Sequence, residues 1–192
     1  VIEKGNYKII GQSQDDAVGE AFDKVAKLLD LPYPGGPHIE KLALEGDPNS
    51  YDFPRPMIHS DNLDMSLSGL KTSVLYTVQK IKNLDHNKKA DIAASFQQAV
   101  TDLLVAKITR AIEETNRKEV IIAGGVAANK FIRSEFKKLE GLLGIKVYYP
   151  DLKYCGDNAS MIAFVGSMMN AEKKGNNPSQ VRARWPLDEL KK

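Results

Sequence analysis

The sequence predicts an α/β fold built from short parallel strands that alternate with helices. Val120–Ala123 is a short apolar run rich in β-branched residues, which is typical of a buried strand. A glycine turn and a helical pattern follow it, and Lys146–Pro150 then supplies a second strand before a last helix. Strand, helix, strand and helix at this spacing indicate a parallel unit with a right-handed crossover.

The composition is that of a folded globular protein. Of the 192 residues, 42% are hydrophobic and 27% are charged, and the net charge of +2 argues against a binding mode dominated by electrostatic attraction to nucleic acid. No apolar run approaches the roughly 20 residues that span a membrane, and no secretory leader is evident. The single cysteine, Cys155, suits a reducing compartment, so we expect a cytoplasmic protein that does not contact membranes. The start at Val1 in place of Met suggests an excerpt from a longer chain.

The N-terminal third contains a candidate strand and a helix. Tyr7–Gly11 is apolar and bounded by glycine, which predicts a strand or a strand end. Residues 12–30 repeat apolar side chains at helical spacing, and Asp15 and Asp16 are placed to cap that helix. The prolines and glycines of Leu31–Pro37 predict that the helix ends there.

The middle of the chain is mostly helical, with helices expected at 38–45, 69–82 and 89–115 and a surface excursion at 47–65. The segment 89–115 has the clearest apolar stripe and contains neither glycine nor proline. After the second strand, Asp157 and Asn158 open a last helix that ends near Gly175. We therefore expect a mostly helical insertion at 38–118 and a βαβα part at 119–192.

The carboxyl ends of the two strands carry candidate binding residues, because ligands of parallel α/β units gather there. Gly124 and Gly125 let the backbone approach a ligand closely, and Asn129 can hydrogen-bond a ribose, a base or a phosphate. The structural alternative is a tight turn with Asn129 as a helix cap. Asp157 lies at the mouth of the next helix, where its carboxylate either binds a divalent cation or caps the helix.

Two further candidates lie in the N-terminal part. The Pro34–Pro37 segment is stiff at its ends and permissive at Gly36, which suits either a loop that holds a flat ligand or a helix terminator. Asp23 lies beside the apolar stripe of its helix, where it either accepts hydrogen bonds from ribose hydroxyls or is a solvated charge.

Several enzyme classes are not indicated. His38, His59 and His86 form neither an HExxH nor an HxxxH pair, so a zinc peptidase has no support. The sequence contains neither a GxSxG turn nor a GxxxxGK[ST] loop, and Cys155 has no evident histidine partner. These absences argue against covalent nucleophilic catalysis and against P-loop nucleotide chemistry.

Taken together and in order, the motifs resemble one family along essentially the whole chain. They are DDAVGEAFDK at 15–24, YPGGP at 33–37, SGLKT at 68–72, AGGVAAN at 123–129, CGDNA at 155–159 and RARWPL at 182–187. The family is TsaD, formerly Gcp, the tRNA threonylcarbamoyladenosine synthases. The resemblance implies the C-terminal lobe of an actin-like, ribonuclease H-like ATPase fold, with a parallel or mixed sheet flanked by helices.

The resemblance also implies an activity and a set of site residues. Members transfer threonylcarbamoyl from threonylcarbamoyl-adenylate to the adenosine beside the anticodon of tRNA. Asp23, Gly36 and Asn129 match positions that hold the adenylate, and Glu40 matches a further substrate-contacting position. Asp157 matches a metal ligand, with iron as the usual metal and zinc as the alternative. TsaB-like and TsaE-like proteins are the implied partners, and ATP is a second implied ligand.

The departures from the family pattern matter as much. The family's remaining metal ligands are two histidines of an HxxxH pair in the N-terminal lobe, and neither that pair nor the SGGHT stretch is present. We therefore expect this chain to be inactive alone and to expose a sheet edge and apolar surface. A non-catalytic, TsaB-like scaffold and a carbamoyltransferase of secondary metabolism are the alternatives. Basic residues that either face tRNA phosphate or are simply solvated are Lys71, Arg133, Lys137, Lys138, Arg182 and Arg184.

Overall fold

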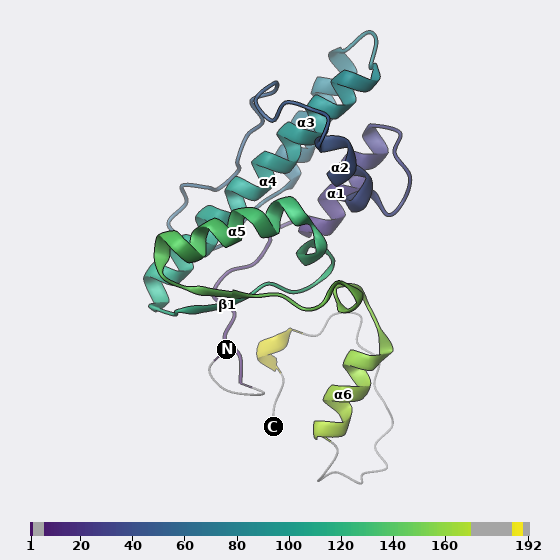
Figure 1. Ribbon diagram of the computed structural model, residues 1–192. Coiled ribbons are helices and arrows are strands. Elements are labelled where there is room, and N and C mark those ends of the chain that lie inside the picture. Colours follow the sequence, from purple (N-terminus) through teal and green to yellow (C-terminus); the bar gives the residue numbers. More distant parts are fainter. Residues whose placement is uncertain (2–5, 170–185, 190–192) are drawn as a thin grey trace.

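A computed structural model describes residues 1, 6–169 and 186–189, and arranges them as a group of helices above a small sheet (Figure 1). The chain is therefore α/β, as the sequence predicts. The helices are α1 Val18–Leu28, α2 Gly35–Ala43, α3 Ser68–Lys80, α4 His86–Thr115, α5 Lys130–Leu143 and α6 Ala159–Met169. The strands are β1 Glu119–Ile121 and β2 Lys146–Tyr148, and the short 3₁₀ turns are η1 Gly125–Ala128, η2 Leu152–Tyr154 and η3 Leu187–Glu189.

Helix α4 is the spine of the core. It is 30 residues long, and its buried face contains several alanines that allow neighbouring helices to approach closely. Helices α1 and α2 pack together and α2 packs along α4, while the ring of Phe22 meets the ring of Phe96 edge-on at 5.1 Å between centroids. The first strand begins at Glu119, and the sequence-predicted division into a helical insertion and a βαβα part stays a prediction.

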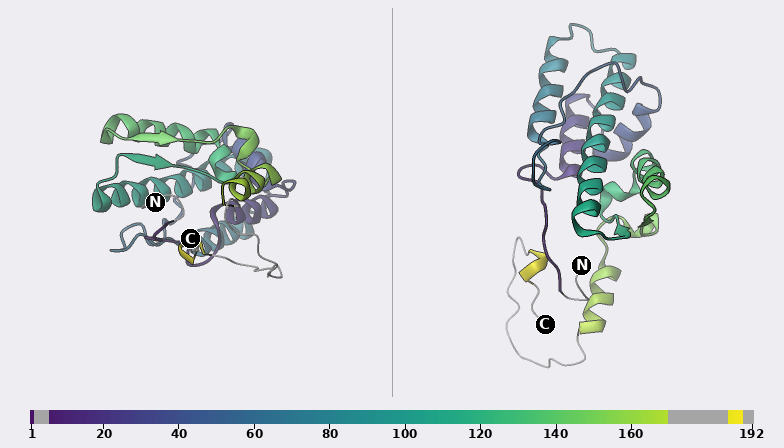
Figure 2. Two further views of the ribbon diagram at one scale, coloured as in Figure 1. Left: turned by 90° about the horizontal axis from the view of Figure 1, so that it is seen from below. Right: turned by 90° about the vertical axis from the view of Figure 1, so that its left-hand side faces the viewer.

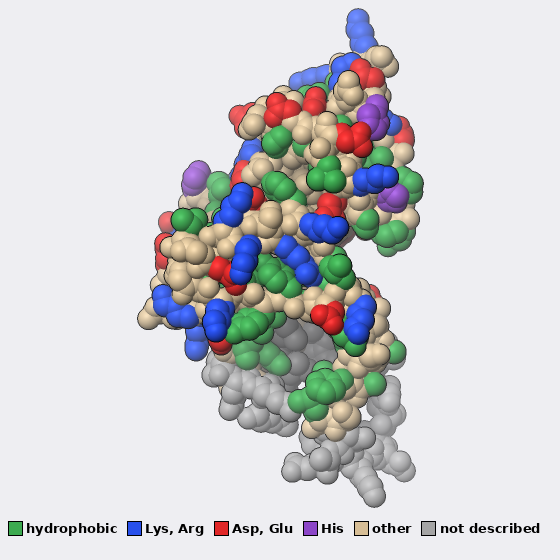
Figure 3. All heavy atoms as spheres, in the orientation of Figure 1, with side chains coloured by type: hydrophobic (Ala, Val, Ile, Leu, Met, Phe, Trp, Pro, Cys, Tyr) green, Lys and Arg blue, Asp and Glu red, His purple; other side chains and the backbone are tan. Residues whose placement is uncertain are grey.

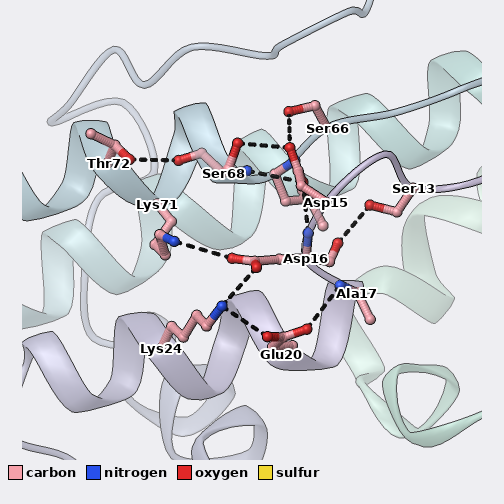
Figure 4. A network of polar contacts seen from close by, with 11 residues as sticks. Ser13, Asp15, Asp16, Ala17, Glu20, Lys24, Ser66, Ser68, Lys71 and Thr72 are labelled. Carbon is pink, nitrogen blue, oxygen red and sulfur yellow. Dashed lines mark hydrogen bonds and ion pairs between the residues drawn. The ribbon is translucent and has the colours of Figure 1, made fainter. Parts of the chain in front are cut away.

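The starts of α1 and α3 are joined by a network of charged side chains (Figure 4). Asp15 accepts hydrogen bonds from the backbone N–H groups of Leu67 (2.8 Å) and Ser68 (3.2 Å). Asp16 lies between Lys24 and Lys71, at 2.6 and 3.3 Å. The expectation that both aspartates cap their own helix was wrong: Asp15 caps α3, and α1 begins later, at Val18, with Glu20 accepting from the N–H of Ala17.

The N-terminal strand expected at Tyr7–Gly11 is not formed. Residues 7–11 have no strand pairing, and the side chains of Ile9 and Ile10 are exposed. Beyond this segment, Ser13 forms an isolated parallel bridge with Met65. Gly11 is needed for this approach, because a Cβ there would lie 2.4 Å from the carbonyl oxygen of Leu63.

The sheet has two parallel strands, in which Val120 pairs with Val147 and Ile121 with Tyr148. Helices α4 and α5 lie on one side of it (Figures 1 and 2). Val120 and Val147 face these helices and are half-buried, whereas Ile121 on the other face is 70% exposed. The expectation of a buried strand therefore holds for one face only, because the described residues place helices on one face of this sheet.

Helix α6 stands apart from the other helices in Figure 1 and in the right-hand view of Figure 2. It is rich in apolar residues, and the side chains of Ile162 (74%) and Phe164 (66%) are largely exposed, as the green surface in Figure 3 illustrates. The stretch from 170 to the expected helix end at Gly175 lies outside the described residues. Within the described part of the chain, no helix combines the length and apolar character that crossing a membrane requires.

Candidate functional site

A pocket of about 480 Å³ lies between α1, the start of α2, the η1 turn and the η2 segment. Its volume falls within the range of small-molecule sites. The pocket brings together Asp23, Gly36, Glu40, Gly125 and Asn129, all of which the sequence singles out. Apolar side chains from three segments form much of the remaining wall, among them Phe22, Val126 and Leu152.

The two central glycines of the Pro34–Pro37 segment have different roles. A Cβ on Gly35 would lie 2.4 Å from the Cβ of Ala26, so this glycine lets α2 pack against α1. A Cβ on Gly36 would meet nothing within 4 Å, although Gly36 lines the pocket. The segment is not a loop, because both glycines lie in the first turn of α2. Gly36 leaves open space that protein packing does not require.

Asp23 holds the start of α2. Its Oδ1 accepts a hydrogen bond from the N–H of Gly35 at 2.7 Å, and the carboxylate is half-buried. Neither sequence interpretation anticipates this contact, because it joins residues on two different helices. Within the described residues, Oδ2 of Asp23 has no hydrogen-bonding partner, so one oxygen remains for a ligand in the pocket.

Glu40 and Asn129 together hold the start of α5. Glu40 Oε1 accepts from the N–H of Lys130 at 2.7 Å, and Asn129 Oδ1 accepts from the N–H of Ile132 at 2.9 Å. The helix-cap interpretation of Asn129 is therefore confirmed, and the same residue also lines the pocket. Its Nδ2 donates to Oε1 of Gln97 at 2.8 Å, and both side chains are buried.

Gln97 is a site residue that sequence reasoning missed. It lies on the buried face of α4 among apolar side chains, with 3% of its surface exposed. A polar amide in that position was the available signal, since a buried amide needs partners. Through this hydrogen bond, Gln97 fixes the orientation of the Asn129 amide in the pocket wall.

The other two sequence candidates lie outside the pocket lining. Gly124 precedes Gly125 and adopts φ +88°, a backbone conformation that favours glycine, so it shapes the turn. Asp157 is exposed and follows Gly156, which does line the pocket. The cap of α6 is Asn158, whose Oδ1 accepts from the N–H of Met161 at 3.0 Å, so Asp157 does not cap this helix through its own side chain.

The described residues do not by themselves fit a metal ion. No three His, Cys, Asp or Glu side chains among them come together in a way that could hold one, and Asp157 is a single exposed carboxylate. A protein metal site takes several such ligands. If Asp157 binds a metal, the other ligands come from outside the described part of this chain.

The basic residues named by the sequence fall into distinct environments. Lys137 and Lys138 lie on the exposed side of α5, where Lys and Arg side chains gather (Figure 3), and pair with Glu140 and Glu135. Lys71 pairs with Asp16. Arg133 is half-buried and hydrogen-bonded to backbone carbonyls, so its side chain is not a freely solvated charge. Arg182 and Arg184 lie outside the described residues.

Chemically, the pocket combines apolar walls with a few hydrogen-bonding groups. The apolar side chains suit the faces of a flat ring, and the free carboxylate oxygens of Asp23 and Glu40 can accept hydrogen bonds from hydroxyl groups. The thiol of Cys155 also lines the pocket, and its hydrogen bonds are to Arg133 and to two backbone carbonyls rather than to a histidine. The arrangement is therefore suited to binding and orienting a ligand.

Comparison with known proteins assigns this architecture to a family. Residues 1–164 match the family model TsaD, tRNA N6-adenosine threonylcarbamoyltransferase. Three proteins of that name are similar over 97% of this chain: one from Herminiimonas arsenicoxydans (47% identical), one from Polaromonas naphthalenivorans (44%) and one from Neisseria meningitidis (43%). The matched region covers 54–58% of each relative, so the chain spans about half their length.

Proposed function

Because this chain belongs to the TsaD family of tRNA N6-adenosine threonylcarbamoyltransferases, we propose that its pocket holds the adenylate part of threonylcarbamoyl-adenylate. The observation that carries the proposal is the convergence of Asp23, Gly36, Glu40 and Asn129 on one pocket. Asn129 is far in the sequence from the other three residues.

Each wall of the pocket has a proposed role. The adenine ring lies against the apolar walls near Gly36, and the free oxygens of Asp23 and Glu40 accept hydrogen bonds from the ribose hydroxyls. Asn129, held by Gln97, keeps the start of α5 in place at the same wall. One oxygen of each carboxylate is already committed to a helix start, which orients the other toward a ligand at little extra entropic cost.

The chemistry asks the protein mainly to position its substrates. The carbonyl carbon of threonylcarbamoyl-adenylate is activated as a mixed anhydride. The exocyclic amine of the tRNA adenosine attacks that carbon and loses a proton, while AMP leaves with the bonding electron pair. Binding the adenylate in a defined orientation lowers the entropic part of the activation free energy of this transfer.

Further features are proposed on the family resemblance. The small parallel sheet and its helices would form one lobe of an actin-like fold, and tRNA together with TsaB-like and TsaE-like proteins would be its partners. Asp157 would supply one ligand to a divalent metal, iron or zinc, which stabilises developing negative charge when bound. Its remaining ligands would come from outside the described residues. No observation favours the scaffold alternative.

Filling the pocket at Gly36 tests the proposal. A Cβ on Gly36 has no neighbour within 4 Å, so the side chain of a Gly36→Leu variant should take up space in the pocket that Gly36 lines. We expect the Kd for AMP, measured by calorimetry, to rise at least tenfold, which corresponds to about 1.4 kcal/mol. Replacing glycine within a helix does not cost helix propensity, so the fold should tolerate the change.

The matched control is Gly141→Leu, in α5. Gly141 is also a helical glycine whose Cβ would have no neighbour within 4 Å, and it does not line the pocket. This variant should bind AMP as tightly as the wild type. Equal affinity of the Gly36→Leu and Gly141→Leu variants, or no binding of AMP or ATP by the wild type, would overturn the proposal.

A further inference from the structure

The side chain of Arg133, on the first turn of α5, lies between two loop segments. Its Nε donates to the carbonyl oxygen of Ala127 in η1. On the other side, Nη2 donates to the carbonyl oxygen of Pro150 at 3.1 Å and approaches Sγ of Cys155 at 3.4 Å. Arg133 therefore joins the segments that follow the two strands of the sheet.

The plane of Arg133 is fixed by an aromatic ring as well. Its Cζ lies 4.8 Å from the centre of the Tyr149 ring, and the hydroxyl of Tyr149 donates to the backbone carbonyl of Arg133 at 3.3 Å. Only a planar guanidinium can stack on a ring and donate in two directions at once. A lysine at this position would keep the charge but lose the planar group that donates hydrogen bonds in two directions.

The two segments that Arg133 joins both contribute to the pocket wall. Val126 and Ala128, the neighbours of Ala127, line it from one segment, and Leu152, Cys155 and Gly156 line it from the other. Among the described residues, no other side chain donates hydrogen bonds to both segments. A side chain that does not itself line the pocket therefore links these two parts of its wall.

We infer that Arg133 is a positioning residue, which holds the 150–156 segment against the η1 turn and so sets the width of the ligand pocket. The inference rests on the proposed function, since it concerns the same pocket. Cys155 can report on the position of this segment, because it is 4% exposed, its thiol contacts Arg133, and it lines the pocket. Releasing the segment should uncover the thiol and weaken ligand binding together.

The test compares the wild-type protein with its Arg133→Gln and Arg133→Lys variants. For both variants we expect the Kd for AMP to rise at least tenfold. We expect alkylation of Cys155 by N-ethylmaleimide, located by peptide mass spectrometry, to accelerate at least tenfold. The matched control is Lys137→Gln on the same helix, whose side chain is 76% exposed and should change neither quantity.

The local readout separates positioning from general destabilisation. A purely global loss of stability would speed alkylation only by the factor by which the unfolded fraction rises, which urea denaturation of each variant measures. Positioning by Arg133 predicts a larger acceleration than that factor. If Arg133→Gln does not fold, Arg133→Lys decides by the same criteria. Wild-type binding that neither variant weakens, or alkylation at the wild-type rate, overturns the inference. A wild type that does not bind AMP overturns the proposed function, and faster alkylation of the variants would then still support the role of Arg133 in holding the segment.

Discussion

At the scale of single residues, the amide of Asn129 connects the pocket to the core. Its Oδ1 caps α5 while its Nδ2 donates to Gln97, so both ends of the amide are engaged. Gln97 in turn projects from the middle of α4, the most deeply packed helix. Helix α4 thereby fixes the position of Asn129 in the pocket wall, because a buried amide that loses its hydrogen-bonding partner costs free energy.

Removing the Gln97 amide should destabilise the protein through this contact. Gln97→Leu keeps much of the side-chain volume but leaves Nδ2 of Asn129 without its acceptor. We expect the free energy of unfolding, measured by urea denaturation, to fall by about 1–3 kcal/mol, the cost of an unsatisfied buried polar group. Gln79→Leu on the exposed side of α3 is the control and should cost little. A loss no greater than that of the control would show that the hydrogen bond contributes nothing.

The sequence could predict part of the site at this scale. Gly36, Gly125 and Asn129 stand out locally, because glycines beside a helix start and an asparagine after a strand have recognisable spacing. Gln97 and Arg133 act on segments that adjoin them only in the folded chain, and neither has a local signature. Asp23 was identified as a candidate, but its contact with Gly35 depends on how α1 and α2 pack.

At the scale of elements, α1 and α3 are joined through their N-terminal ends. Burial by itself would raise the pKa of Asp15, but hydrogen bonds from Ser66, Leu67 and Ser68 hold that pKa well below its usual range. The ion pair with Lys24 lowers the pKa of Asp16 against the opposing effect of burial, and Lys71 lowers it further. The folded state therefore stabilises the ionised form of both carboxylates, relative to the unfolded chain.

Acid should weaken this junction. A carboxylate whose pKa is lower in the folded state stabilises the fold above its unfolded pKa of about 3.9, and that stabilisation is lost as the pH falls through the folded value. We expect the free energy of unfolding to drop below about pH 5 and Asp15→Ala to flatten that drop. At pH 7 the same variant should lose about 1 kcal/mol, the usual value of a helix cap. The control is Asp61→Ala, with a fully exposed side chain; identical pH profiles for wild type and Asp15→Ala would contradict the role of Asp15.

Long helices were more predictable than short strands. The helix expected at 89–115 begins only three residues earlier, at His86, because its apolar stripe and lack of glycine decide its conformation locally. The N-terminal strand failed, since a strand needs a partner that sequence periodicity does not name. The cap interpretation of Asp15 failed for a related reason: an aspartate before one helix can serve another that packs beside it.

At the scale of the whole molecule, apolar surface remains open on two elements. The free face of the sheet exposes Ile121 and Tyr148, and α6 exposes much of its apolar surface. Such surface is common where further protein packs. Together with the half-length match to its relatives, this leads us to propose that the pocket described here is one wall of a larger active site.

The 192-residue chain alone should therefore bind AMP but not transfer threonylcarbamoyl. We expect no modified adenosine after incubation with threonylcarbamoyl-adenylate and unmodified tRNA, because one wall of a site binds the adenylate without orienting the tRNA amine toward it. The assay is read by nucleoside mass spectrometry, with and without TsaB-like and TsaE-like proteins. The full-length relative from Neisseria meningitidis, 43% identical over the shared region, is the positive control under the same conditions. Turnover by the isolated chain at a rate near that of the control would mean that the site is complete within these 192 residues.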